Sequence, residues 1–203
     1  MSAVTVVFPR LRWLALAWLA VWIPIYWIYW GWPTFLLLCD ISLLVGCLGL
    51  FSGNALLIST QALATPLIGL LWALDFSWRF FLGHHLIGGT EYMWDTRFPL
   101  WTRLASFFHI ALPILLIWAL RRVGYDRRAW LAQSGIAAIL LAASRLIHPA
   151  RNLNFAFRAP ILHRSLGPAP LHLAIIFAGL VLVLYGPVHL ALARSFPAPE
   201  EKS

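Results

Sequence analysis

Cys39 and Asp40 stand side by side within an apolar run, FLLLCDISLL (35–44), where an ionised carboxylate is costly. A thiol becomes a nucleophile when a histidine takes its proton, and His109 lies in a later apolar segment. Asp40 could orient that histidine, as carboxylates do in catalytic triads. The three residues suggest acyl transfer, with Cys39 as nucleophile and His109 as general base. The structural alternative is an inert buried thiol beside an acid that stabilises a helix N-terminus.

Further polar residues lie near the same predicted depth and could bind a substrate or stabilise an oxyanion. They are Glu91, Arg145, Asn152, Asn154 and His172. Asp75 and Arg79 are four residues apart, so they are predicted to pair on one helix face. Because ionisable groups in a membrane are costly unless paired or hydrated, this clustering predicts a polar cavity open to the outer face. The opposite half of the bundle is predicted to be dry.

Metal and cofactor sites have weaker support. The loop GHHLIGGTEYMWD (83–95) contains two adjacent histidines, whose side chains point to different sides of most backbones, and its spacing is not diagnostic of zinc. No metal and no cofactor is therefore predicted. His109 and His172, at similar depth, leave open a haem held between two axial histidines.

The elements that would position these residues are membrane helices. The chain has 203 residues, 62% of them hydrophobic and 11% charged, whereas a soluble domain has about 25% charged residues. Segments long enough to span a bilayer, at about 20 residues each, are roughly 11–30, 34–58, 62–83, 104–120, 129–147 and 169–193. The predicted fold is all-α, a polytopic membrane helical bundle of about six transmembrane helices over residues 1–194, with a short polar tail at 195–203.

Arginine-rich segments set the predicted orientation, because cytoplasmic loops are enriched in Lys and Arg. Arg10 and Arg12 precede the first span, the loop RRVGYDRR (121–128) joins the fourth and fifth, and Arg194 and Lys202 follow the last. With six spans these regions share one side, so both termini are predicted to be cytoplasmic, in a multi-pass protein of the cell inner membrane. The net charge of +8 is assigned to lipid headgroups and orientation, and not to nucleic acid.

One face of the second span consists of small residues. Cys39, Ser42, Gly46, Gly49 and Gly53 recur at helical spacing along it. Small residues let helix backbones approach closely in lipid. This face is therefore predicted to pack against other helices and to turn Cys39 into the bundle.

Three short motifs resemble those of a known family. GWPTFLLLCDISLL (31–44), FFHIALP (107–113) and GPAPLHL (167–173) look like segments of the androgen-induced and androgen-dependent TFPI-regulating multi-span hydrolase family, and of related acyltransferase-like membrane proteins. The resemblance implies hydrolysis or transfer of fatty acyl groups, with His109 as base and Cys39, or else Thr34, as nucleophile. GTEYMWD, GYDRR and NLNFAF also look like motifs of uncharacterised bacterial membrane-associated proteins.

Two functions follow as hypotheses. The first is a membrane-embedded lipid-acyl hydrolase or acyltransferase whose partners are membrane lipids. The second is a non-enzymatic accessory or assembly subunit of a larger membrane complex, with partner membrane subunits and a bound haem or pigment. Turnover of an acyl lipid distinguishes the first from the second.

Overall fold

The computed structural model describes residues 7–199, and every regular element within that range is helical. The elements are α1 (Leu11–Trp30), η1 (Trp32–Leu36), α2 (Leu38–Ser52), α3 (Ala55–Leu82), η2 (Glu91–Met93), α4 (Leu100–Ala105), α5 (Phe108–Val123), α6 (Ala129–Ser144), η3 (Pro149–Arg151), η4 (Leu153–Phe155), α7 (Ala169–Ala178), the π-helical η5 (Gly179–Tyr185) and α8 (Gly186–Ser195). The last residues of the predicted polar tail, with Lys202, lie outside the described residues. The prediction of an all-α fold is confirmed.

Four helical segments are long and apolar enough to cross a membrane. They are α1, α3, the α4–α5 segment Leu100–Val123 and the α7–η5–α8 segment Ala169–Ser195. The apolar helices α2 and α6 are shorter, with 15 and 16 residues. The membrane character predicted from composition therefore agrees with the structure, which gives four helices of spanning length.

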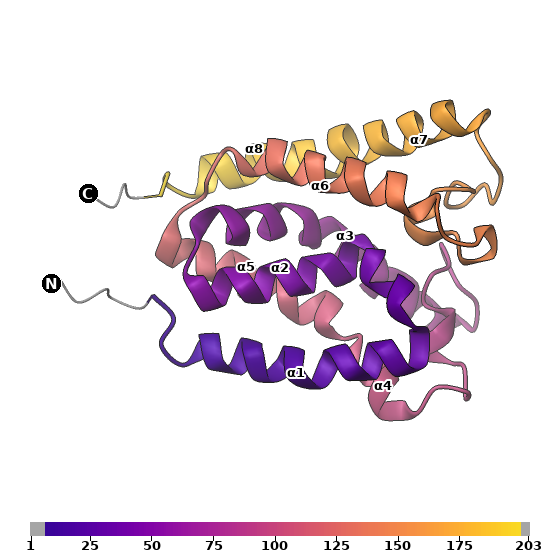
Figure 1. Ribbon diagram of the computed structural model, residues 1–203, viewed down its shortest axis with the longest axis horizontal. Coiled ribbons are helices and arrows are strands. Elements are labelled where there is room, and N and C mark those ends of the chain that lie inside the picture. The colour runs from indigo at the N-terminus through magenta and orange to yellow at the C-terminus, as the bar shows by residue number, and fades with distance from the viewer. Residues whose placement is uncertain (1–6, 200–203) are drawn as a thin grey trace, which may run out of the picture.

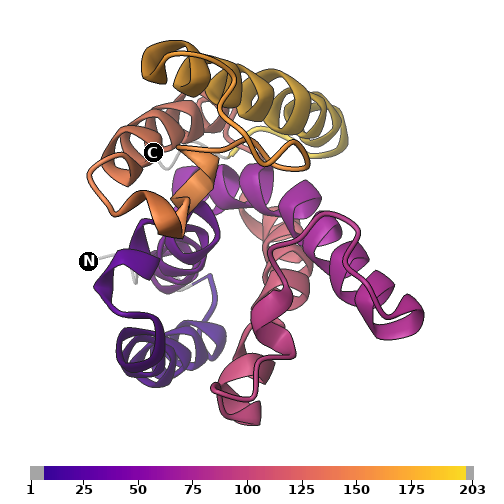
Figure 2. The ribbon, with the colours of Figure 1, turned by 90° about the vertical axis from the view of Figure 1, so that its right-hand side faces the viewer.

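The helices form a bundle whose two ends differ (Figure 1). The start of α1, the loop at 124–128 and the end of α8 lie together at one end, called the terminal end below. The long loops at 83–99 and 145–168 lie at the opposite end, called the loop end. Helix α3 packs against α2, α5 and α6, while its C-terminal part diverges from the other helices (Figure 2). The contacts of α3 thus connect the two sides of the bundle.

The boundary between α2 and α3 differs from the predicted one. The apolar run was expected to continue to residue 58, but α2 ends at Ser52 and α3 begins at Ala55. Gly53 adopts a left-handed conformation with φ of 65°, which suits glycine at a helix C-terminus. The Asn54 side chain then accepts a hydrogen bond from the backbone N–H of Leu57 at 3.0 Å and caps α3. A tight turn therefore replaces the expected long second helix.

Helices α3 and α5 approach each other closely at Gly69. Pro113 has no backbone N–H, so the carbonyl of His109, one turn earlier, lacks its usual helical donor. This carbonyl faces Gly69, where an added Cβ would come closer to the oxygen than real Cβ atoms ever lie. Glycine is therefore required at position 69, and the contact fixes the place of His109 relative to α3.

The half of the bundle at the terminal end contains buried polar groups, so the prediction of a dry half is wrong. Gln61 of α3 donates from Nε2 to Oε1 of Gln133 of α6 at 3.2 Å. Gln133 Nε2 in turn lies 3.4 Å from the hydroxyl of Tyr185, which ends η5. All three side chains are buried. Uncharged hydrogen bonds thus connect α3, α6 and η5, which is how membrane helices satisfy polar groups in lipid.

Candidate functional site

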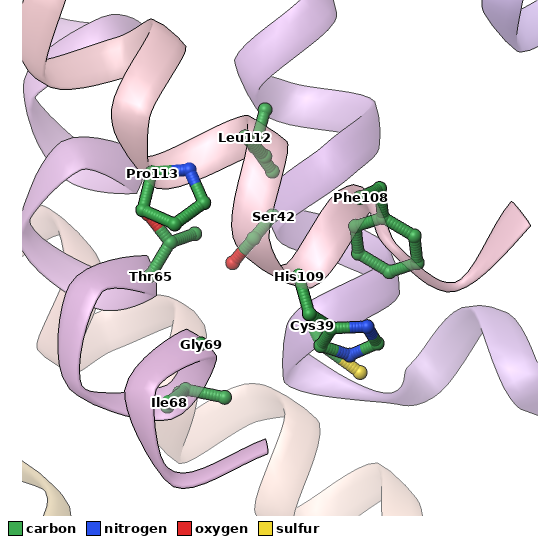
Figure 3. Close-up of a pocket in the computed structure, with 9 residues that line it drawn as sticks. All are labelled: Cys39, Ser42, Thr65, Ile68, Gly69, Phe108, His109, Leu112 and Pro113. Atoms are coloured by element: carbon green, nitrogen blue, oxygen red, sulfur yellow. The ribbon is translucent and has the colours of Figure 1, made fainter. Parts of the chain in front are cut away.

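Cys39 and His109 line the same cavity, although they come from different helices (Figure 3). Helix α2 contributes Cys39 to the wall, α3 contributes Gly69, and α5 contributes His109 and Pro113. The volume of the cavity is about 10 Å³, close to the space that one water molecule needs. The surface that lines it is largely apolar, although Ser42, Thr65 and His109 contribute to the lining. The site therefore brings a thiol and an imidazole to one small space with little polar surface.

The orientation of His109 fixes its tautomer. Its Nδ1 lies 2.7 Å from the backbone carbonyl oxygen of Ser106. A carbonyl only accepts, so Nδ1 carries the hydrogen and Nε2 is left as the proton acceptor. The ring stacks on Trp72, with centroids 5.0 Å apart and planes 4° apart, and on Phe108 at 4.1 Å. In the neutral imidazole, Nε2 is thus the free basic nitrogen.

Asp40 contacts Cys39 and not His109. The carboxylate is 1% exposed, accepts a hydrogen bond from the Thr34 hydroxyl at 2.7 Å, and lies 3.7 Å from the Cys39 sulfur, which donates to it. The orienting role predicted for Asp40 is taken by the carbonyl of Ser106. The hydroxyl of Thr34, the alternative nucleophile, is bound to Asp40. Within residues 7–199 no hydrogen bond joins His109 to Cys39.

Several further contacts around His109 involve residues that the sequence did not single out. The side-chain oxygen of Ser106 lies 2.8 Å from the Tyr26 hydroxyl. Trp72, which stacks on His109, donates from its indole N–H to the Tyr92 hydroxyl at 3.0 Å. Burial raises the pKa of the Tyr92 phenol, so that it stays protonated at neutral pH. Aromatic residues near span ends are also typical of the interfacial belt, so their residue type alone did not indicate that they surround His109.

Asn152 and Asn154 have structural partners and lie apart from the cavity. Asn154 accepts a hydrogen bond from the backbone N–H of Leu38 at 2.9 Å and donates to the carbonyl of Leu36 at 2.7 Å. It thereby caps α2 from a distant segment, because the first N–H groups of a helix lack helical acceptors. Asn152 accepts from the N–H of Arg158 at 2.9 Å and donates to its carbonyl at 2.9 Å. Both amides were predicted to bind substrate, but Asn152 binds backbone within the 145–168 loop and Asn154 attaches this loop to the start of α2.

Replacing Asn154 by alanine is expected to lower the melting temperature in detergent. The Leu38 N–H and the Leu36 carbonyl would both lose a partner, and each unsatisfied buried group costs about 1–3 kcal/mol. Thermal unfolding followed by tryptophan fluorescence measures the effect. Asn154→Asp keeps the acceptor for the Leu38 N–H, so its melting temperature should lie between those of wild type and Asn154→Ala. An unchanged melting temperature in Asn154→Ala would contradict the capping role.

His172 and Arg145 also bind backbone groups of the same loop. His172 is fully buried, accepts from the N–H of Leu166 at Nδ1 at 3.2 Å, and donates from Nε2 to the carbonyl of Phe155 at 2.9 Å. Both ring nitrogens are occupied, which leaves none for the haem iron that was considered. Arg145 donates to the carbonyl of Ala156 at 3.1 Å. These two residues therefore position the loop and do not face the Cys39 cavity.

The predicted pair of Asp75 and Arg79 is not formed. Asp75 accepts hydrogen bonds at one oxygen from the backbone N–H groups of residues 86–88, at 2.7–3.0 Å. The other oxygen binds the Thr90 hydroxyl and lies 3.1 Å from Nδ1 of His85. The guanidinium of Arg79 lies instead over the ring of Trp94, 5.8 Å from its centroid. Asp75 is the anchor of the loop that follows α3.

The single polar cavity predicted at the loop end is therefore several separate clusters. Glu91, predicted to bind substrate, is exposed and accepts from the N–H of Gly89 at 2.7 Å. Within the described residues no group of His, Cys, Asp or Glu is placed to hold a metal ion. Cys39, Asp40 and His109 are the predicted site residues that lie together around the cavity or beside it.

Comparison with known proteins gives no relative from which a function could be inferred, so a proposal depends on the geometry of the site. Residues 31–44 and 107–113 supply part of the cavity wall, and Thr65, Ile68 and Gly69 of α3 supply the rest. No family model, curated protein or solved structure matches the chain.

Proposed function

We propose that this chain is a membrane-embedded acyltransferase that carries an acyl group on Cys39. The observation that supports the proposal is that Cys39 and His109, from α2 and α5, line one cavity. His109 has its Nδ1 bound to Ser106 and its Nε2 free to accept a proton. A thiol with a neighbouring base is the pair that thioester formation needs.

The proposed reaction has two steps, acylation of Cys39 and transfer of the acyl group to an acceptor. His109 Nε2 takes the thiol proton, and the Cys39 sulfur attacks the carbonyl carbon of a lipid ester. The ester C–O bond breaks, and the proton passes from His109 to the departing alkoxide, which leaves a thioester on Cys39. An acceptor hydroxyl or amine then gives its proton to His109 and attacks the thioester. The C–S bond breaks, and the proton returns to the Cys39 sulfur.

The character of the cavity favours transfer over hydrolysis. The surface that lines it is largely apolar and its volume is about 10 Å³, and a site that excludes water protects a reactive intermediate from hydrolysis. A lipid ester is larger than this volume, so substrate entry requires α2, α3 and α5 to separate around Cys39. This requirement also gives weight to the alternative of an accessory subunit, which needs no substrate to enter.

The proposed topology places the site near the outer surface. Helices α2 and α6 would complete six crossings, with both termini in the cytoplasm of a bacterial cell and the loop end outside. Cys39 is the second residue of α2, which begins at the loop end. Lipid ester groups lie just below the headgroups, so Cys39 would meet them in the outer leaflet.

Intact-mass spectrometry of detergent-purified protein after incubation with a reactive fatty-acyl ester tests the proposal. Wild type is expected to gain a single acyl mass that hydroxylamine releases, as thioesters do. Cys39→Ala should gain none. Cys47→Ala is the matched control, because Cys47 is a buried thiol on the same helix outside the cavity, and it should be acylated like wild type. An unacylated wild type would favour the accessory-subunit alternative, and an acylated Cys39→Ala would overturn the assignment of Cys39 as the nucleophile.

A further inference from the structure

The terminal end of the bundle carries exposed arginines on adjacent elements, here called the arginine surface. Its exposed members are Arg10, Arg121, Arg122, Arg127, Arg128 and Arg194. The ring of Phe8, just before α1, lies 6.0 Å from that of Trp118 in α5. The N–H of Tyr125 donates to the carbonyl of Pro197, beyond α8, at 2.8 Å. These contacts join the start of α1, the end of α5 and the end of α8, so the arginines beside them lie at the same end of the bundle.

Little of this charge is compensated within residues 7–199. Asp126 is the one carboxylate that the described residues place at the terminal end, and Arg128 holds it at 2.8 Å and lowers its pKa. Within residues 7–199 the guanidinium groups of Arg121 and Arg127 donate no hydrogen bond and form no ion pair. Clustered cations repel one another, so this surface is stabilised by anions from outside the chain.

Arginines at the loop end are used differently. There the guanidinium groups reach partners within the protein, namely Asp95 for Arg97, Met93 for Arg103, Ala156 for Arg145 and Trp30 for Arg151. Arg158 and Arg164 are exposed at that end without such partners. The two ends therefore differ in how many arginines are free to bind anions, and the loop end provides a matched comparison.

Helix electrostatics account for part of the arrangement. Arg121 and Arg122 lie in the last turn of α5, and Arg194 in the last turn of α8, where a cation is favourable. Arg127 does not fit this explanation, because it precedes the N-terminus of α6, where a cation gains nothing from the helix. Its charge points to a partner outside the protein.

We infer that the arginine surface binds the headgroups of anionic phospholipids and selects them over zwitterionic ones. The guanidinium group suits phosphate, because it donates two parallel hydrogen bonds. Trp13 and Trp118, whose rings lie against Arg12 and Arg122, stand at the same end, as is typical of indoles at a membrane interface. The charge of the surface is complementary to the phosphates of the leaflet that covers it.

Native mass spectrometry of the full chain, released from detergent in the presence of phosphatidylglycerol or phosphatidylcholine, tests the inference. Wild type should retain phosphatidylglycerol in preference to phosphatidylcholine. Each arginine near an anionic surface contributes about fivefold to binding. Arg121→Gln with Arg127→Gln should therefore weaken retention of phosphatidylglycerol by about 10- to 30-fold.

The matched control is Arg158→Gln with Arg164→Gln, which removes the same charge at the loop end. Because Arg158 and Arg164 are fewer than the exposed arginines at the terminal end, this variant should weaken retention of phosphatidylglycerol less than Arg121→Gln with Arg127→Gln does. Equal losses in both double variants would show a general effect of net charge and overturn the inference, as would equal retention of the two lipids by wild type. Arg127→Gln alone lies outside the helices and should lose about fivefold, which provides a test if the double variant folds poorly.

Discussion

Gly69→Ala is expected to abolish the folded protein or to lower its melting temperature more than the other substitutions considered. The added methyl group would overlap the carbonyl oxygen of His109, and backbone cannot move aside as a flexible side chain can. Overpacking a core costs about 1–3 kcal/mol, and a clash with backbone should lie at the upper end. Size-exclusion chromatography and thermal unfolding in detergent measure the outcome.

Gly135→Ala is the matched control for this substitution. Gly135 lies within α6, and a Cβ added there meets nothing within 4 Å. Alanine favours a helix over glycine by about 1 kcal/mol, so the control should be as stable as wild type or more stable. If Gly69→Ala unfolded at the wild-type temperature, the close approach of α3 and α5 would be wrong, and the position of His109 with it.

Helix content and membrane character could be predicted from the sequence because both depend on composition. Long apolar runs specify membrane helices wherever they occur. The boundary between α2 and α3 was predicted wrongly, because the interruption Ser52-Gly53-Asn54 is short and the flanking residues on both sides are apolar. The signal was local: Gly53 followed by Asn54 is a helix end followed by a cap. Chain-reversing residues therefore carried more information at this point than hydropathy.

The candidate site was predictable in depth but not in contacts. Cys39 and His109 were placed at similar levels by counting residues from the span ends, and the structure adds that α2 and α5 bring them to one cavity. Which helices are neighbours depends on packing, and the small-residue face of α2 was the feature of the sequence that indicated where another helix packs. Gly46 on that face lies against Leu112 and Leu116 of α5.

The polar residues of the loops were misread for a common physical reason. Asp75 was expected to pair with Arg79, but three backbone N–H groups bind it instead. Asn154 and His172 were expected to bind substrate, but Asn154 binds backbone at the start of α2 and His172 binds backbone of the irregular 145–168 segment. Irregular backbone at the membrane needs partners from the protein. Polar residues there first satisfy the main chain, and sequence alone does not show which main-chain groups are free.

His109→Gln is expected to slow acylation of Cys39 by about 10²–10⁴-fold, the contribution of a general base. Glutamine cannot take the thiol proton, but its amide can still donate a hydrogen bond to the carbonyl of Ser106, so folding should persist. The rate at which the acyl mass appears on the protein at neutral pH, followed by intact-mass spectrometry, gives the measurement. Thermal unfolding in the same detergent shows whether the variant is folded.

His84→Gln is the control, because His84 is an exposed histidine in the loop after α3 and does not line the cavity. Its acylation rate should equal that of wild type. A folded His109→Gln protein acylated at the wild-type rate would mean that Cys39 reacts without help from the imidazole. The hydrogen bond to Ser106 and the stacking on Trp72 would then serve packing alone, and Asp40, which accepts a hydrogen bond from the thiol, would be the candidate base.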